Sequence, residues 1–295
     1  MLSPRHFGPR PIRTLPEENG LVPGYRRIRV RPATPVIGAT VEGVDLRKPL
    51  DEELFRELER ALLQCKVLFF RDQPISAAEQ LAFARHFGEV EVHPFLPAGE
   101  VPEVIRFEKD EQVKGVENIW HSDVSWREVP SMGSILHAIE VPSVGGDTLW
   151  ADMAAAWQGL PDDLKERIEG LEAVHDFAHS FGLLLSPEEL EEKRRQFPPA
   201  VHPVVRTHPR TGEKILYVNQ IFVSHIVGLE EEESDRLLAE LCAQAAIPEY
   251  QVRFRWEPHS VAFWDNRSTQ HYAVSDYWPR RRVMERVTII GERPR

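Results

Sequence analysis

Residues 120–126 read WHSDVSW, and the triplet His121-Ser122-Asp123 at their centre is the starting point for interpreting the chain. In an extended strand, alternate side chains lie on one face, so His121 and Asp123 would point together while Ser122 points away. One imidazole and one carboxylate are two of the ligands that a metal site needs. The triplet alone is weak evidence, because a surface pair has the same pattern. A third ligand must therefore come from elsewhere in the sequence.

His271 is the strongest candidate for that third ligand. It lies in WDNRSTQHYAVSDYWPRRR (264–282), a turn-rich segment that follows the strand-like run SVAFW. Two histidines and one carboxylate on one face of a metal leave positions open for small molecules. This arrangement is typical of non-haem Fe(II) oxygenases.

The chain has 12 histidines, so chance pairings are expected. His137 lies in an apolar strand-like run and is predicted to be a core residue. His175 and His179 are four apart but have no acidic partner in register, which argues against a metal site. His202 and His208 flank the run VVRT beside prolines, and we expect both in turns or at the surface.

Two arginines in RVMERVTII (282–290) suggest an anion-binding face. In a strand, Arg282, Met284 and Arg286 share one face. Buried arginines are costly without anions to bind, and the planar guanidinium suits carboxylate, sulfonate and sulfate oxygens. The alternative is an exposed edge face on which Glu285 pairs elsewhere.

Composition bounds the class of protein. The chain has 295 residues, and 36 Lys and Arg against 47 Asp and Glu give a net charge of −11, which argues against general nucleic-acid binding. Two cysteines in helix-like runs exclude a disulfide scaffold and a thiolate zinc site. No stretch is apolar enough for a membrane span, and the first residues lack a secretory signal pattern. We expect a cytoplasmic protein with no membrane or nucleic-acid partner.

Periodicity predicts one mainly β domain. Residues 1–24, rich in Pro and Arg, are expected to form a flexible leader, and residues 25–295 a single domain. Many short strand-like runs alternate with helical patterns at 51–65, 77–88, 161–170, 186–196 and 229–246. An α+β fold with a β-barrel or jelly-roll core, flanking helices and insertions accounts for this pattern. Residues 97–118 are expected to be a mobile loop that can close over the site.

Seven blocks together resemble the Fe(II)/2-oxoglutarate-dependent taurine dioxygenase family (TauD/TfdA-like), and within it the alkylsulfatase and alkylsulfonate dioxygenases. The blocks are KVLFFRDQ, LAFARHFGEVEVHP, WHSDVSW, GGDTLWADM, HPVVRTHPRTGEKILYVN, WDNRSTQHYAVSDY and RRRVMERVTIIGERP. The resemblance runs from about Tyr25 to the C-terminus. It implies a double-stranded β-helix (jelly roll), Fe(II), 2-oxoglutarate as cosubstrate and O2. It also implies a homo-oligomer, either a dimer or a tetramer.

The resemblance assigns roles to individual residues. His121, Asp123 and His271 match the iron ligands. Thr148 and Arg282 match the residues that hold the far end of 2-oxoglutarate. The positions that match the binding site of the prime substrate are His93, Val124 through its backbone, Phe181, Phe222 and Arg286.

Departures from the family pattern concern the part of the substrate away from its anionic group. Leu96 replaces a tyrosine that helps position the amine of taurine, and Val116 and Glu117 replace an Asp and an Asn near that amine. Glu117 could still bind an ammonium, but the set of polar residues that surrounds the amine in the family is not reproduced as a whole. A sulfonate or a sulfate ester therefore fits better than taurine.

The expected reaction is hydroxylation of the carbon next to the anionic group of a small organic substrate. The adduct collapses to an aldehyde and sulfite or sulfate, with succinate and CO2 as further products, in sulfur scavenging. One alternative is a dioxygenase of a small carboxylate such as an aryloxyalkanoic acid. Another, from a different class, is a non-catalytic jelly roll that binds a metal or an anion.

Overall fold

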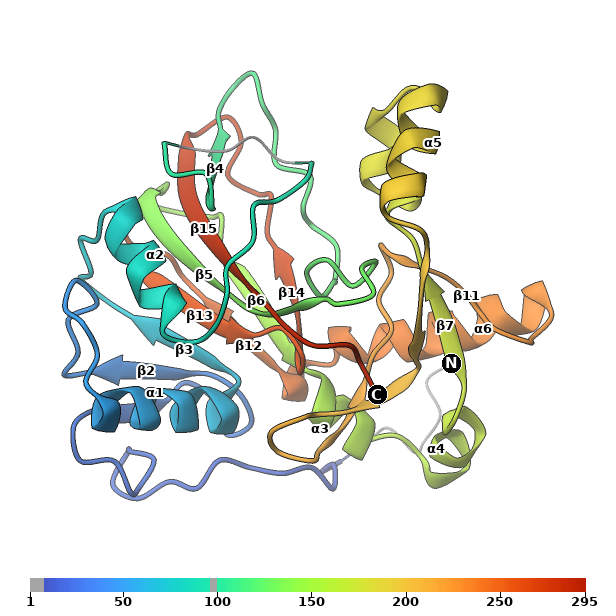
Figure 1. Ribbon diagram of the computed structural model, residues 1–295. Coiled ribbons are helices and arrows are strands. Elements are labelled where there is room, and N and C mark those ends of the chain that lie inside the picture. The colour runs from blue at the N-terminus through green and yellow to red at the C-terminus, as the bar shows by residue number, and fades with distance from the viewer. Residues whose placement is uncertain (1–7, 96–99) are drawn as a thin grey trace.

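The computed structural model describes residues 8–95 and 100–295, and its centre is a stack of two β-sheets (Figure 1). The larger sheet has the strand order β1-β2-β3-β13-β5-β15-β4, and only the β2–β3 pair is parallel. Its strands are β1 (Arg29–Pro32), β2 (Ala39–Glu42), β3 (Val67–Phe70), β4 (Val104–Lys109), β5 (Ser131–Glu140), β13 (Val261–Asp265) and β15 (Arg282–Ile290).

The smaller sheet of the stack has the order β12-β6-β14, with antiparallel neighbours. Its strands are β12 (Gln251–Phe254), β6 (Thr148–Asp152) and β14 (Thr269–Ala273). Two further antiparallel sheets lie beside the stack: β11-β7-β8 and β10-β9. Their strands are β7 (Glu172–His175), β8 (Ala200–Pro203), β9 (Val205–Thr207), β10 (Lys214–Leu216) and β11 (Val223–Ile226).

Two helices, α1 (Glu52–Cys65) and α2 (Ala77–Arg85), cover one face of the larger sheet (Figure 1). The Asp51 side chain caps α1 by accepting from the Leu54 N–H, and a capping box of Ser76 and Glu79 opens α2. The apolar stripe of α1, including Leu58, packs against this face. The opposite face is left for the smaller sheet.

Successive residues of β13 lie in two different hydrophobic cores, one on each face of the larger sheet. Phe263 belongs to the core beneath α1 and α2, whereas Trp264 belongs to the core between the sheets. Trp150 of β6 and Met284 of β15 also lie in the second core. Because successive strand residues point to opposite faces, the alternate residues of β15 that begin with Arg282 face the space between the sheets.

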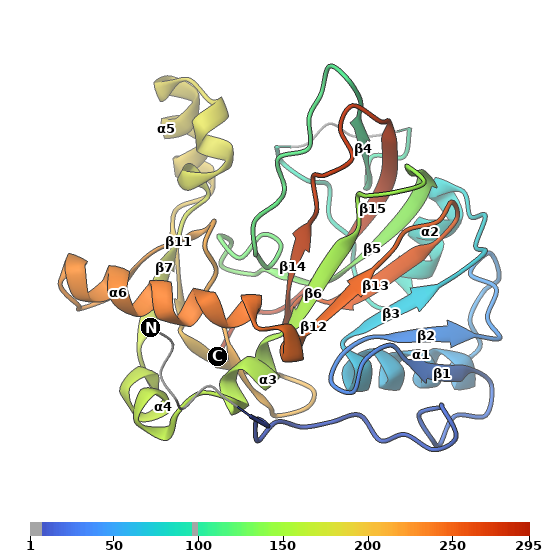
Figure 2. The same ribbon diagram turned by 180° about the vertical axis from the view of Figure 1, so that it is seen from behind.

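The other helices lie at the ends and sides of the stack. They are α3 (Met153–Gln158), α4 (Asp162–Ile168), α5 (Pro187–Gln196) and α6 (Glu231–Cys242), with 3-10 turns η2 (Phe177–His179), η3 (Phe181–Leu184), η4 (Ala243–Ala246) and η5 (Pro248–Tyr250). None of the residues of α5 is buried, and this helix stands away from the sheets in both side views (Figures 1 and 2). It opens with a capping box of Ser186 and Glu189.

The expectation that residues 97–118 form a loop is wrong for residues 104–109, which form the edge strand β4. β4 pairs with β15 so that Ile105 lies opposite Arg286. Arg106 and Glu108 hid the pattern because an edge strand tolerates charged side chains on its open face. Residues 97–99 lie outside the described part of the chain.

Residues 8–24, which fall in the predicted leader, lie against the body of the protein. Leu15 and Val22 are buried in the core beneath α1 and α2. The Arg13 N–H donates to Gln158 Oε1 at 2.7 Å. The division into a leader and a domain at Tyr25 remains a prediction.

Cys65 and Cys242 are buried free thiols. Burial raises the pKa of both thiols to about 12. Within residues 8–95 and 100–295, no helix combines the length and apolar character needed to cross a membrane.

Candidate metal centre and anion-binding cavity

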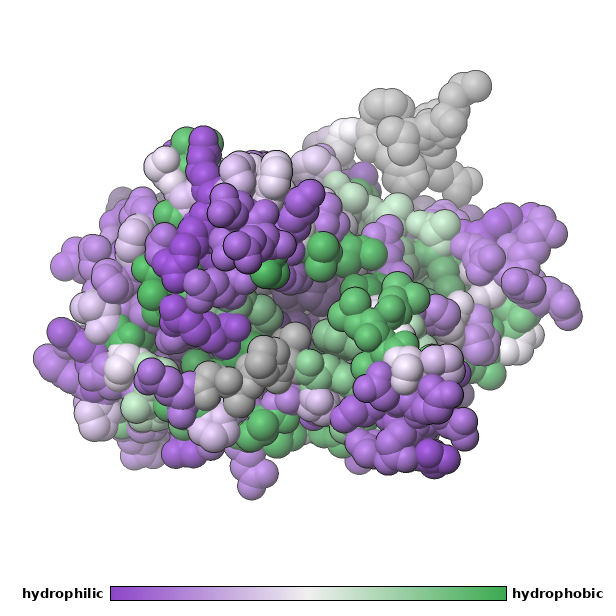
Figure 3. Space-filling model, turned by 90° about the horizontal axis from the view of Figure 1, so that it is seen from above, coloured by the Kyte–Doolittle hydropathy of each residue, from purple (hydrophilic) through white to green (hydrophobic). Residues whose placement is uncertain are grey.

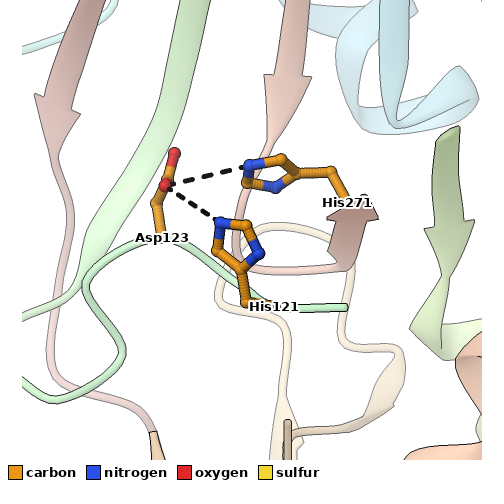
Figure 4. Close-up of side chains that lie close together, drawn as sticks. All are labelled: His121, Asp123 and His271. Atoms are coloured by element: carbon orange, nitrogen blue, oxygen red, sulfur yellow. Dashed lines mark ion pairs between the residues drawn. The ribbon is translucent and has the colours of Figure 1, made fainter. Parts of the chain in front are cut away.

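Two histidines and one aspartate from distant parts of the sequence converge between the sheets (Figure 4). His121 and His271 form an antiparallel bridge: the His271 N–H donates to the His121 carbonyl at 2.8 Å, and the reverse bond measures 3.1 Å. Asp123 Oδ1 lies 3.8 Å from His121 Nε2 and 3.9 Å from His271 Nε2. One ligand atom from each residue lies within 4.8 Å of the others. Asp123 begins a turn, so the triplet is extended only at its start.

The protonation pattern of the three residues suits a divalent metal. His121 Nδ1 lies 2.8 Å from the Ile119 carbonyl, which can only accept, so Nδ1 donates there and Nε2 is the ring nitrogen left to face Asp123. Burial, with His121 nearby, lowers the pKa of His271 to about 3, which keeps this ring neutral. Two neutral imidazoles and a carboxylate are the donor set that Fe(II) takes in non-haem sites. The residues therefore fit the iron that the family resemblance implies.

Asp123 is held as a carboxylate. Burial by itself favours the protonated acid, but Arg286 and then the two histidines outweigh it and lower the pKa of Asp123. Arg286 Nη1 donates to Oδ1 at 2.9 Å, and Ser134 Oγ donates to Oδ2 at 3.1 Å. Oδ1 is thus the atom that faces both the histidines and the arginine.

The two histidines open onto a cavity that also holds both predicted arginines. His121, His271, Thr148, Arg282 and Arg286 all line it. The sequence prediction that Arg282, Met284 and Arg286 share one face is confirmed, because all three side chains border this cavity. Two buried cations beside a metal-binding face indicate a site for anions.

The Arg282 end of the cavity presents hydrogen-bond donors. Arg282 is 8% exposed, and its Nε and Nη2 atoms have no hydrogen-bond partner among the described residues. Burial lowers the pKa of Arg282, while Tyr277 and Glu117 act in the opposite direction. Trp256 Nε1 donates to Thr148 Oγ1 at 2.9 Å, and this leaves the Thr148 hydroxyl proton for another acceptor. A carboxylate would satisfy both residues.

Residues predicted to bind the prime substrate lie near Arg286 but are not among those that line this cavity. His93 is buried, and burial, followed by the nearby Arg286, lowers its pKa to about 3, so the ring is neutral. Val124 has φ 47°, a left-handed conformation that β-branched residues rarely adopt and that is typical of functional sites. The Arg286 guanidinium lies over the Phe107 ring, 5.0 Å from its centroid.

Two predicted aromatic residues extend this group. The Phe181 ring centroid lies 5.6 Å from that of His93 and 6.4 Å from that of Phe222. Phe222 lies 6.4 Å from the His121 ring. Seen from above, the surface is hollowed near its centre, and hydrophobic residues border the hollow (Figure 3).

An ion pair that the sequence did not reveal also lines the cavity. Lys109 Nζ lies 2.7 Å from Glu117 Oε1, and Glu117 Oε2 accepts from the Val116 N–H at 2.9 Å. Lys109 lies opposite Arg282 in the β4–β15 register, so recognition of β4 would have revealed it. Both oxygens of Glu117 are therefore occupied within the protein. Leu96, the other departure near the amine position, lies outside the described residues.

The expectation of a turn or surface position is wrong for His202, which is buried in strand β8. His208 lies in the connection between β9 and β10, as a turn residue would, but it is buried. His208 Nε2 lies 3.0 Å from Asp265 Oδ2, and His202 Nε2 lies 2.8 Å from the Arg127 carbonyl. These partners compensate for burial of the rings. His137 is buried, as expected.

Comparisons with known proteins agree with this geometry. The chain is 39% identical over 284 residues to an alpha-ketoglutarate-dependent sulfate ester dioxygenase of Pseudomonas putida, covering 92% of each chain. It is 35% identical over 280 residues to an alpha-ketoglutarate-dependent 2,4-dichlorophenoxyacetate dioxygenase of Cupriavidus pinatubonensis, covering 88% of this chain and 97% of that relative. Alpha-ketoglutarate is another name for 2-oxoglutarate.

Solved structures show the same fold. The crystal structure of a taurine dioxygenase from Burkholderia xenovorans matches with a TM-score of 0.79 and 36% sequence identity, over 91% of this chain and 93% of that one. The family described as "Taurine catabolism dioxygenase TauD, TfdA family" matches residues 29–288. The chain therefore belongs to the TauD, TfdA family of taurine catabolism dioxygenases.

Proposed function

We propose that the protein is an Fe(II)- and 2-oxoglutarate-dependent dioxygenase that hydroxylates the carbon next to a sulfate ester or sulfonate group. The observation that carries this proposal is the shared cavity: His121 and His271, which converge with Asp123, line it together with the buried Arg282 and Arg286. Two separate cations suit two separate anions, a cosubstrate carboxylate and the anionic group of the prime substrate.

His121, Asp123 and His271 would hold the iron. When bound, Fe(II) with 2-oxoglutarate and O2 supplies an oxidant for a C–H bond, with succinate and CO2 as products. Arg282 and Thr148 would bind the far carboxylate of 2-oxoglutarate, since each offers a donor that no described residue uses. Their burial keeps that contact free of competing water.

Arg286, His93 and the backbone of Val124 would bind the anionic group of the prime substrate. The guanidinium contributes charge, whereas the neutral His93 contributes a hydrogen bond without a second charge. Phe181 and Phe222 would form an apolar wall that excludes water from the organic part. Together these residues would orient the carbon next to the anion toward the iron.

The products follow from the chemistry of the adduct. One oxygen atom of O2 enters succinate, and the other becomes a hydroxyl on the carbon that bears the ester oxygen. The bond from that carbon to the ester oxygen then breaks as the hydroxyl loses its proton, which leaves an aldehyde and sulfate. With a sulfonate, the carbon–sulfur bond breaks and sulfite leaves instead.

A sulfate ester is the preferred substrate class in this proposal. The Pseudomonas putida relative is named for sulfate esters. Glu117 is bonded to Lys109 and the Val116 N–H, which leaves it unsuited to a substrate ammonium. The relative named for 2,4-dichlorophenoxyacetate makes a carboxylate the second candidate, because Arg286 could bind either anion.

The proposal extends to architecture. We propose that the stacked sheets form the double-stranded β-helix (jelly roll) expected from the family resemblance, with residues 1–24 as a leader to this domain. The facing arrangement of the two sheets and the position of the metal-binding residues between them support this. A homo-oligomer, either a dimer or a tetramer, is likewise proposed from the resemblance alone.

The test is reconstitution with Fe(II) and 2-oxoglutarate under anaerobic conditions, followed by O2 and a panel of anions. Alkyl sulfates, alkyl and aryl sulfonates, taurine and aryloxyacetates would be compared by succinate formation. Stimulation by alkyl sulfates with release of sulfate supports the proposal. Stimulation only by carboxylates would assign the protein to the second candidate class, and no succinate despite bound iron would make it a non-catalytic metal- and anion-binding protein.

A further inference from the structure

The side chain of Asn266 bonds to both polar atoms of the Asp123 backbone. Asn266 Oδ1 accepts from the Asp123 N–H at 2.8 Å, and Asn266 Nδ2 donates to the Asp123 carbonyl at 2.9 Å. The same Nδ2 donates to Ser131 Oγ at 2.8 Å. Asn266 is 1% exposed, in the turn between β13 and β14. Its amide is thus committed to the segment that carries one expected metal ligand.

Asn266 is one of several links between the triplet 121–123 and the segment 266–271. The backbones of His121 and His271 are bridged, and Ser122 Oγ donates to the Thr269 carbonyl at 2.8 Å. Each residue of the triplet is therefore held by the segment that carries the second histidine. Among the hydrogen bonds described between these two segments, those of Asn266 are the ones made to Asp123.

The backbone at Asp123 needs such support. Asp123 begins a turn, and the next residue, Val124, has φ 47°, which is strained for a β-branched side chain. Ser134 Oγ fixes the outer carboxylate oxygen, Oδ2, but does not fix the direction in which the side chain leaves the backbone. The two bonds from Asn266 fix the peptide groups on both sides of the Asp123 Cα atom, and hence that direction.

We propose that Asn266 is a positioning residue of the metal centre, which aims Asp123 Oδ1 at the two histidines before any metal binds. The inference rests on the proposed function only in taking His121, Asp123 and His271 as the ligands. An asparagine suits the task because its amide is short and supplies one acceptor and one donor. Aspartate has nearly the same shape but lacks the donor.

The test measures binding of Co(II), used alone as the probe metal, to the full-length apo protein. The variants are Asn266→Ala, Asn266→Asp and, as a matched control, Ser122→Ala. The control breaks a buried hydrogen bond between the same two segments but leaves the Asp123 backbone bonded. Circular dichroism and thermal unfolding of each apo protein report on the fold, and a titration followed by cobalt absorbance gives the Kd.

We expect both Asn266 variants to raise the Co(II) Kd about 10-fold, the lower end of the effect of losing a partner that orients a ligand. Ser122→Ala should keep the Kd within about 2-fold even if its unfolding temperature falls. If Asn266→Ala does not fold, the nearly isosteric Asn266→Asp decides. Wild-type Co(II) affinity in a folded Asn266 variant, or an equal loss in Ser122→Ala, would overturn the proposal.

A separate variant distinguishes this outcome from failure of the proposed function. His271→Ala should abolish Co(II) binding, and retained binding would show that the ligand set itself is wrong. A wild-type protein that binds Co(II) but forms no succinate with Fe(II) would refute the oxygenase function. The comparison between Asn266 and Ser122 variants would still be valid in that case.

Discussion

Arg286 Nη1 donates to Asp123 Oδ1 at 2.9 Å, so the cation expected to bind the substrate contacts the carboxylate expected to bind iron. The same oxygen faces His121 and His271. A metal and an arginine would therefore share one carboxylate, and a substrate anion would share the arginine. This contact couples the expected metal-binding residues to the expected substrate-binding residues. A substitution of Arg286 therefore tests both.

Arg286→Gln should abolish most substrate binding without weakening the metal. Truncating one member of a buried charge pair costs ~2–5 kcal/mol, so kcat/KM for an alkyl sulfate should fall by about 100-fold. Co(II) affinity should stay equal or increase, because the change removes a positive charge beside the metal. Steady-state kinetics and a Co(II) titration check both points. Arg106→Gln is the matched control, since Arg106 is exposed on β4, and a fall of metal affinity only in Arg286→Gln would contradict this account.

Arg282→Gln should impair the cosubstrate selectively. Its side chain has unpartnered buried donors among the described residues, and these are assigned to the far carboxylate of 2-oxoglutarate. The KM for 2-oxoglutarate should rise by about 10- to 100-fold, while the KM for the alkyl sulfate changes little. Thr148→Val should act in the same direction and Thr148→Ser should not. Equal increases of both KM values would show that Arg282 does not distinguish the two anions.

The motifs that carry these residues could be predicted because their patterns are local. The His-x-Asp triplet and the arginine face of residues 282–286 each lie within a few positions. Strand geometry relates the two arginines directly, whereas the triplet is extended only at its start because Asp123 begins a turn. The turn-rich segment around His271 marked this residue as the candidate third ligand, and the family blocks then supplied Thr148, whose place in the cavity no local pattern gives. The capping boxes of α2 and α5 were readable for the same local reason.

Other features were hidden because their partners are distant in sequence. His208 is buried against Asp265, 57 positions away, and His202 against the Arg127 carbonyl, 75 positions away. No residue close in sequence to either histidine indicates such a partner. β4 was missed because its exposed charges resemble those of a loop, and Lys109 was missed with it.

Lowering the pH should destabilise the apo protein through its buried neutral histidines. Burial, with His259 nearby, lowers the pKa of His137 from 6.5 to about 4. Between these values the unfolded chain binds a proton that the folded protein does not, so the free energy of unfolding falls as pH drops through 6.5 toward 4. Chemical denaturation at several pH values across this range gives the free energy of unfolding. Its slope against pH should be shallower for His137→Gln than for wild type. His225→Gln, an exposed control, should leave the slope unchanged, and equal slopes for all three proteins would contradict the assignment.

The Lys109–Glu117 pair should make the enzyme select against a substrate ammonium. Taurine and propanesulfonate have similar shapes but differ in that charge, and kcat/KM should be at least about 10-fold lower for taurine. Lys109→Met leaves Glu117 without its cation, so Glu117 could accept a substrate ammonium more easily. The ratio of kcat/KM for propanesulfonate to that for taurine should therefore decrease. Competition between the two sulfonates, followed by sulfite release, measures the ratio. Lys114→Met, a change in the neighbouring loop, is the control, and a ratio unaffected by Lys109→Met would disprove this role.

The most direct test of the central claim is the stoichiometry of the reaction with an alkyl sulfate. Under limiting O2, the Fe(II)-loaded protein should form one succinate, one sulfate and one aldehyde for each O2 consumed, and His271→Ala should form none. Succinate formation that does not depend on the alkyl sulfate, or sulfate release without O2 and 2-oxoglutarate, would contradict the claim that this cavity carries out oxidative cleavage of sulfate esters.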